Sequence, residues 1–317
     1  MNYAVGIDLG GTFIKFGVAS SNGDLIYEDT ISSQAETGPD KVIENIVRAT
    51  IMSLGRATEL NICPLGIGVG TPGIIDRANR IVLGGADNIN GWTQIHLADL
   101  IEKKCQLPVW INNDANMMGL GEQAFGAAKN CSDVLFLTIG TGIGGAIIID
   151  GKLFGGYDNR GTELGHIPLF SDGLPCSCGG TGCLEVYAST NALIRQFENR
   201  CKLSDVHLEN EISGRLITKL YKEKYILAVE SLNDHWRFLG RGIAGLVNIF
   251  SPQKVIVGGG ISESGVFYIE KLNEEFQKQV MPDCAVNTKI CAAKLGNRAG
   301  ILGAAQFVFI QKNNRNS

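Results

Sequence analysis

The sequence lacks several features that would place it in other classes of protein. Acidic residues outnumber basic ones, 32 against 28, and the net charge is −4. Because nucleic-acid phosphates call for clustered cations, we expect no nucleic-acid partner. No apolar run approaches the ~18 residues that span a bilayer, and the first residues, MNYAVGIDLG, contain no basic leader. We therefore predict a cytoplasmic protein with no membrane partner.

Charged residues make up only 19% of the chain and hydrophobic residues 44%, as in ordinary globular proteins. Its 317 residues exceed the size at which one hydrophobic core stops growing, which predicts two lobes. The nine cysteines are an odd number, and six of them have no paired spacing. We interpret these six as reduced core thiols: Cys63, Cys105, Cys131, Cys201, Cys284 and Cys291.

Glycine is the one residue in clear excess, with 41 copies, about twice its average share. The glycines gather at a few turns, where the backbone needs a positive φ or approaches another group closely. These turns separate short apolar runs. Residues 3–8, 14–19 and 25–30 predict a three-stranded meander, and the pattern returns at 134–139, 146–149 and 152–154. The chain is therefore predicted to contain two related halves.

The segments between and after the meanders alternate between helix and strand, which indicates α/β lobes. We predict helices at 39–56 and 96–105, several more within 190–250, and a last one from about residue 297. Strands are predicted at 65–69, 109–112 and 254–257. We place the lobe boundary near Asn116, which gives lobes at 1–115 and 116–302. The C-terminal helix, residues 303–317, is expected to pack back on the first lobe.

The first glycine turn joins two strands, unlike a P-loop or a dinucleotide fingerprint, whose glycines begin a helix. In such a hairpin, Gly10 and Gly11 let backbone N–H groups face an anion. Thr12 adds a hydroxyl donor and Lys15 a positive charge, while Asp8 could hold a divalent metal through water.

A second glycine loop, residues 140–145, would face the first and bind the same phosphates. Glycines 258–260, at a strand end, suit close approach of an adenosine. Either loop alone could be only a tight hairpin, because glycine is the default turn residue. Two matched loops argue against that simpler interpretation.

The motifs DLGGT at 8–12, GTGIGG at 140–145 and GGG at 258–260 resemble the nucleotide loops of sugar kinases, heat-shock ATPases and actin. The resemblance implies a two-lobed ribonuclease H-like (actin-like ATPase) fold, with ATP and sugar in the interdomain cleft. It does not by itself identify the reaction. The residues it implies for ATP and Mg²⁺ are Asp8, Gly10, Gly11, Thr12, Lys15, Thr141, Gly142, Gly259 and Gly260.

A local cluster of metal-binding residues lies between residues 166 and 183. His166 and three cysteines, Cys176, Cys178 and Cys183, have the spacing H-x9-C-x-C-x4-C. Three thiolates and one imidazole complete a tetrahedral zinc site with no open position, so we predict a structural zinc. The alternatives are three unrelated buried thiols or a nucleic-acid zinc ribbon, although residues 167–190 contain no lysine or arginine.

The run Glu163–His166, followed by the pattern C-x-C-G-x-x-G-C-x-E, resembles the ROK family (repressors, open reading frames and kinases), especially its glucokinase-like members. The resemblance runs over nearly the whole chain. It implies a sugar substrate, a homodimer or homotetramer, and a second role for His166, whose other ring nitrogen would contact the sugar. The sugar-binding residues that it implies are Gly73, Asn88, Asn113, Asp114, Glu163, His166 and Glu185.

Asp114 is our candidate for the general base, accepting a proton from the sugar hydroxyl on C6. It follows the strand predicted at 109–112, at the end where open α/β sheets bind their ligands. Spacing alone would favour a helix cap at Asn113, Asp114 or Asn116, and the resemblance favours catalysis. The expected reaction is ATP-dependent phosphorylation of glucose to glucose 6-phosphate.

Three other functions stay open. An N-acetylhexosamine kinase is the first, because Phe13 and the pair Ile89–Asn90 depart from the common family pattern and leave the sugar's 2-substituent undecided. A sugar-sensing transcriptional regulator is the second; its helix-turn-helix domain would precede this fold, and we expect none because the first loop begins eight residues from Met1. An ATP-dependent scaffold without catalysis is the third.

Overall fold

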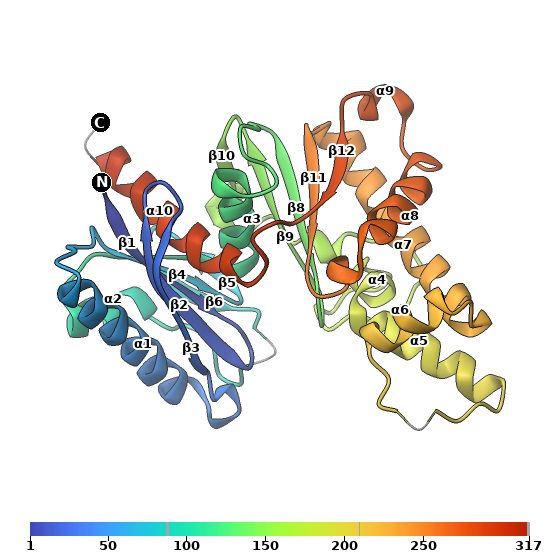
Figure 1. Cartoon of the computed structure of the whole chain (residues 1–317), viewed down its shortest axis with the longest axis horizontal. Helices are drawn as coiled ribbons and strands as arrows, with labels where there is room; N and C mark the ends of the chain where they lie inside the picture. The colour runs from blue at the N-terminus through green and yellow to red at the C-terminus, as the bar shows by residue number, and fades with distance from the viewer. Residues whose placement is uncertain (87–88, 209, 316–317) are drawn as a thin grey trace. The chain divides into compact units, whose positions relative to one another are not determined.

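The computed structural model describes residues 1–86, 89–208 and 210–315. The chain divides into two compact units, each of mixed α/β structure (Figure 1). Unit 1 contains residues 1–132, 146–162 and 294–317, and unit 2 contains residues 133–145 and 163–293. Among the described residues, no helix is both long and apolar enough to cross a membrane.

Unit 1 is built on a five-stranded sheet with the order β3-β2-β1-β4-β7. Strands β1 (Tyr3–Leu9), β2 (Phe13–Ser20) and β3 (Leu25–Ser32) pair antiparallel, which confirms the first predicted meander. Strands β4 (Ile67–Thr71) and β7 (Val109–Asn113) continue the sheet in parallel. The strand predicted at 65–69 thus begins two residues later. A small hairpin that the sequence did not predict, β5 (Ile74–Asp76) with β6 (Ile81–Gly84), follows β4.

Alternate residues of β1 face opposite sides of this sheet. Val5, Ile7 and Leu9 join the core beneath α1 (Pro39–Glu59) and α2 (Leu97–Cys105). The opposite face is covered by α3 (Asp114–Phe125) and α10 (Ala299–Arg315), with Ala4 in their shared core. In Figure 1 the red helix α10 runs beside the blue strands of this sheet.

Helices α3 and α10 pack closely enough to require glycine at their contact. A Cβ added at Gly303 of α10 would lie 1.7 Å from the carbonyl oxygen of Met117 in α3. No side-chain rotation relieves a clash with backbone, so any larger residue must separate the helices. At Gly55, on the exposed side of α1, an added Cβ would meet no atom within 4 Å.

This difference predicts opposite effects for one chemical change. Gly303→Ala should lower the free energy of unfolding by about 3 kcal/mol, because it overpacks the α3–α10 contact. Gly55→Ala should raise it by about 0.5–1 kcal/mol, because alanine favours a helix interior without meeting other atoms. Urea denaturation of both variants measures the two changes. Equal effects would contradict the packing argument.

The lobe boundary expected near Asn116 falls inside α3. That helix packs against α10 and β4, so the first compact unit continues to Ser132. Unit 1 also contains residues 146–162 and 294–317. Residues 303–317, which we expected to pack against the first lobe, are therefore part of this unit. Helix α10 begins at Ala299 and contacts β1, β2 and β4.

The second sheet has five strands in the order β10-β9-β8-β11-β12. Taken in chain order, its strands repeat the arrangement of the first sheet, which confirms the two related halves. Its members are β8 (Val134–Ile139), β9 (Ile143–Ile149), β10 (Lys152–Phe154), β11 (Lys254–Gly258) and β12 (Lys289–Ala292). Strand β12 was missed because its four residues show no alternation of apolar and polar side chains.

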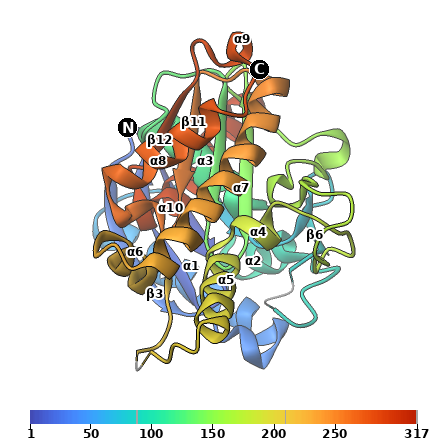
Figure 2. The ribbon, with the colours of Figure 1, turned by 90° about the vertical axis from the view of Figure 1, so that its right-hand side faces the viewer.

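The helices of unit 2 gather around the long helix α7 (Ile226–Phe250), which contacts five others (Figure 2). Trp236 and Leu239 of α7 are buried among them. These five are α4 (Glu185–Ala188), α5 (Thr190–Leu203), α6 (Gly214–Lys222), α8 (Val266–Gln277) and α9 (Pro282–Ala285). Short 3-10 turns lie at Ala35–Thr37, Tyr157–Asn159, Leu164–His166, Ser262–Ser264 and Gly296–Arg298.

Candidate active site

The first glycine turn closes the hairpin between β1 and β2. The Gly10 N–H donates to the carbonyl oxygen of Phe13 at 2.9 Å. Ser33 holds the other side of the turn: its N–H donates to the Thr12 carbonyl at 2.9 Å and its hydroxyl to the Gly11 carbonyl at 2.7 Å. Neither glycine has a positive φ. Position 10 favours glycine because an added Cβ would lie only 3.1 Å from the carbonyl oxygen of Phe13, and not because the backbone is left-handed.

Asp8 and Lys15 pair across this hairpin, one on each strand. Asp8 is buried, and its Oδ1 atom has no hydrogen-bond partner within the described residues. Burial, together with the negative charge of Asp114, raises the pKa of Asp8 to about 7, while Lys15 opposes the shift. The Lys15 Nζ donates to Asn297 Oδ1 at 2.7 Å. Unit 1 therefore brings Asp8, Lys15 and Asp114 close together.

At the junction of β7 and α3, the helix cap and the candidate base are two different residues. Asn113 caps the helix, because its Oδ1 accepts from the Asn116 N–H at 3.2 Å. Its Nδ2 donates to the carbonyl oxygen of Gly73 at 3.2 Å. Asp114 Oδ1 accepts from the N–H of Ala115 at 2.9 Å. The capping role therefore belongs to Asn113, and the half-buried Asp114 is the carboxylate beside Asp8.

A further contact holds the loop that contains Gly73. This glycine has a φ of 102° and lies next to β5. The indole Nε1 of Trp92 donates to Thr71 Oγ1 at 3.0 Å, and both side chains are buried. The loop is thus fixed from two sides, by Asn113 and by Trp92. The predicted sugar residue Asn88 lies outside the described residues.

The second glycine loop joins β8 and β9 in unit 2. Its turn closes with a hydrogen bond from the Gly140 N–H to the Gly142 carbonyl at 2.9 Å. Glu185 Oε2 accepts from the Ile143 N–H at 2.7 Å, and the Thr190 N–H donates to the Gly140 carbonyl at 2.9 Å. Glu185, expected as a sugar ligand, is therefore also an anchor of this loop.

A pocket of about 320 Å³ in unit 2 includes this loop in its wall. Thr141 lines it together with Gly260, so two of the predicted nucleotide loops meet there. Gly259, with a φ of 92°, lies immediately before Gly260, just beyond β11. The polar residues that complete the wall could not be predicted from sequence spacing, because they lie on or beside separate helices: Thr190, Asn191, Ser213, Arg215 and Ser264.

Glu163 immediately precedes the 3-10 turn Leu164–His166, and His166 is the last residue of that turn, at the start of the cysteine segment. The His166 N–H donates to the Glu163 carbonyl at 3.0 Å. The surrounding protein raises the pKa of the Glu163 carboxyl by desolvation, while His166 opposes this and the charge of Glu185 adds to it. Unit 2 therefore brings together the three polar residues Glu163, His166 and Glu185.

The four predicted zinc ligands converge, with their ligand atoms all within 4.8 Å of one another. His166 Nδ1 lies 3.5 Å from Cys176 Sγ, and the Sγ atoms of Cys178 and Cys183 lie 3.7 Å apart. Zn–S bonds of ~2.3 Å in a tetrahedron place two sulfurs ~3.8 Å apart. The donor set and its spacing therefore fit a zinc ion.

The chain is similar to known proteins over nearly its whole length. The sequence model of the ROK family matches residues 4–311. The glucokinase of Thermotoga maritima is 34% identical over 313 residues, covering 96% of each chain. A xylose repressor of Caldicellulosiruptor bescii is 34% identical over 311 residues, covering 96% of this chain and 77% of the repressor.

A solved structure extends the comparison to the fold. The Streptomyces griseus ROK glucokinase, in complex with glucose and AMPPNP, has a TM-score of 0.83 and 32% identity. The match covers 96% of this chain and 99% of that one. The fold is therefore the predicted actin-like ATPase fold. On the family match across nearly its whole length, the chain belongs to the ROK family.

Proposed function

We propose that this protein is an ATP-dependent sugar kinase that phosphorylates glucose on its 6-hydroxyl. The observation that carries the proposal is full-length similarity to glucokinases, one of them solved with glucose and an ATP analogue. The chain's own chemistry agrees with that reaction, because a buried carboxylate, a lysine and a second carboxylate lie together in unit 1.

In this proposal Asp114 is the general base. It accepts the proton of the sugar 6-hydroxyl as that oxygen attacks the γ-phosphate. Its position at the first residue of α3, immediately beyond β7, suits this role, because open α/β sheets bind ligands at the carboxyl ends of strands. The neighbouring Asn113 supplies the cap, so Asp114 is not required for that purpose.

Asp8 is the residue that we propose to hold Mg²⁺ through water. A buried carboxylate with an unpartnered oxygen and a raised pKa is costly unless a cation faces it, and oxygen ligands suit magnesium. When bound, the ion neutralises charge on the phosphate oxygens. The residues proposed to bind the phosphates and nucleoside are Gly10, Gly11, Thr12, Lys15, Thr141, Gly142, Gly259 and Gly260.

The proposed sugar ligands are the backbone of Gly73 and a set of polar side chains that suit hydroxyl groups: Asn88, Asn113, Asp114, Glu163, His166 and Glu185. Such ligands discriminate between sugars because the wrong epimer leaves a buried polar group unpaired. His166 takes part in two sites. Its Nδ1 faces Cys176, which leaves Nε2 for a sugar hydroxyl.

The zinc is proposed to be structural. Four protein ligands leave no position for water or substrate, so the ion would not take part in phosphoryl transfer. Its effect would be to hold a glycine-rich segment that buries little apolar surface of its own. Through His166 it would also keep the sugar ligands of unit 2 in place.

One coupled assay of ADP production tests the proposed function. The panel comprises glucose, other hexoses, N-acetylglucosamine, N-acetylmannosamine and xylose. We expect glucose to give the largest kcat/KM. Preference for an N-acetylhexosamine would favour the alternative kinase, whereas no sugar-dependent ADP with any member would reject a sugar kinase altogether.

A further inference from the structure

Glu122 of α3 is a buried carboxylate with an unusual set of partners. Its side chain is fully buried, and its two oxygens accept three backbone N–H groups. Oε2 accepts from Ala127 at 2.7 Å, and Oε1 accepts from Lys294 at 2.9 Å and from Leu295 at 2.7 Å. Such charge-assisted bonds are about twice as strong as neutral ones. Glu122 thus ties α3 to a segment more than 160 residues later in the sequence.

The segment that Glu122 holds leads directly to the phosphate hairpin. Asn297, two residues beyond Leu295, accepts from the Lys15 Nζ at 2.7 Å. Gly300, in the first turn of α10, lies so close to Asp8 that an added Cβ would be 2.3 Å from the carboxyl carbon. The position of residues 294–300 therefore sets the surroundings of both charged groups in the hairpin.

Helix α3 carries the candidate base at its other end. Asp114 is its first residue, and Glu122 lies two turns further along the same rigid element. All of these residues belong to unit 1. One helix therefore relates the position of Asp114 to that of the segment packed against Lys15 and Asp8.

We propose that Glu122 is a positioning residue for the ATP side of the reaction, an inference that rests on the proposed kinase function. It holds residues 294–300 so that Asn297 orients Lys15 and the start of α10 stays against Asp8. Its side chain is fully buried, so we expect it to act through these contacts and not by binding a substrate. Its removal should therefore affect the use of ATP more than the binding of sugar.

Glu122→Gln tests this role with little change in size. The amide replaces one acceptor oxygen with an NH₂ donor, which faces backbone donors and loses at least one of the three hydrogen bonds. We expect kcat/KM for ATP to fall about tenfold to a hundredfold, as for displaced reacting groups. The dissociation constant for glucose without ATP, measured by equilibrium dialysis, should change less than about twofold.

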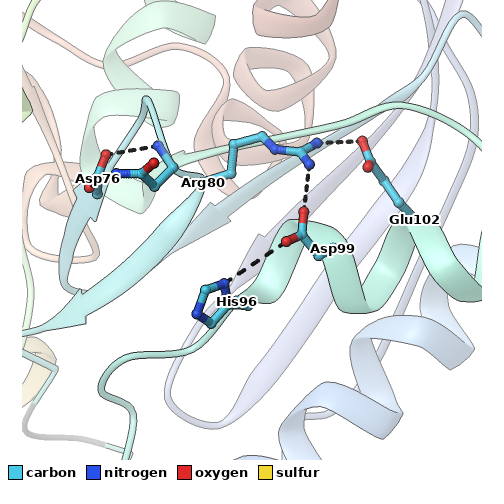
Figure 3. Close-up of polar contacts among 6 residues, drawn as sticks. Asp76, Arg80, His96, Asp99 and Glu102 are labelled. Atoms are coloured by element: carbon cyan, nitrogen blue, oxygen red, sulfur yellow. Dashed lines mark hydrogen bonds and ion pairs between the residues drawn. The ribbon is translucent and has the colours of Figure 1, made fainter.

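Glu102 of α2 offers a matched control in the same unit. Its Oε1 accepts from Arg80 Nη1 at 2.6 Å and from the Val109 N–H at 2.8 Å. Figure 3 shows Arg80 reaching across to Glu102 and Asp99 on this helix. Glu102→Gln also removes a charge and weakens a bond to backbone, but its hydrogen-bond partners Arg80 and Val109 lie outside the β1–β2 hairpin that carries Asp8 and Lys15. We expect lower stability and normal kinetics.

A second variant keeps the test decisive if Glu122→Gln does not fold. Asn297→Ala removes the partner of Lys15 directly and should lower kcat/KM for ATP in the same way. In the double variant the two losses should not add, because both act through one contact. Normal ATP kinetics for Asn297→Ala, or equal kinetics for Glu122→Gln and Glu102→Gln, would overturn the inference. An inactive wild-type protein would instead reject the proposed function, and this inference with it.

Discussion

Asp114→Asn should lower kcat for sugar phosphorylation by about 10²- to 10⁴-fold, the usual contribution of a general base. Asparagine has the size of aspartate and retains an oxygen that can accept from the Ala115 N–H. It cannot take up the proton of the sugar hydroxyl. Affinity for the sugar should change less than about tenfold, because the amide still offers a hydrogen bond to the hydroxyl.

Single-turnover kinetics with saturating sugar and ATP measure this loss, and equilibrium dialysis measures the sugar affinity. Asp99→Asn is the matched control, since Asp99 lies in the same unit and pairs with Arg80 on α2. It should leave kcat unchanged. Near-normal turnover by Asp114→Asn would remove Asp114 from the role of base.

Cys178→Ser should abolish zinc binding and lower the melting temperature by about 10 °C, as expected for a loss of several kcal/mol. The hydroxyl of serine is a much poorer zinc ligand than a thiolate. Cys178 is exposed, so the substitution removes a ligand without opening a cavity in the core. The loss of stability can therefore be assigned to the metal.

Elemental analysis of the purified protein should find about one zinc per wild-type chain and almost none in the variant. Thermal unfolding before and after chelation provides the second measurement. Cys63→Ser is the control, because Cys63 lies outside the cluster and is exposed, whereas the sequence had predicted a core thiol there. It should keep both the zinc and the melting temperature. A wild-type melting temperature that chelation does not change would contradict a structural zinc.

Zinc removal should also weaken sugar binding. His166 is one of the four residues of the cluster, and its N–H donates to the carbonyl oxygen of Glu163. Cys183 lies two residues before Glu185, which anchors the second glycine loop. Disorder in this segment would therefore displace three proposed sugar ligands together. In the Cys178→Ser variant, KM for glucose should rise even where the protein is still folded.

The sequence by itself determined the features that depend on short-range spacing. Strand alternation and turn glycines located both meanders within three residues, because the pleat repeats every two residues. The Cys/His cluster could be predicted because its four metal-binding side chains lie within 18 residues of one another in the sequence. Asp114 could be placed at the end of β7 for the same local reason.

Contacts between distant segments were decided only by the tertiary structure. Spacing left three candidates for the cap of α3, and the hydrogen bond from Asn116 assigned it to Asn113. The unit 2 pocket lined by Thr141 and Gly260 also contains Asn191 and Arg215, which follow no common pattern in the sequence. Glu122 looks like any polar residue of a helix until the fold brings residues 294 and 295 to its carboxylate. Periodicity records which face of an element is buried, but it carries no information about which distant segment covers that face.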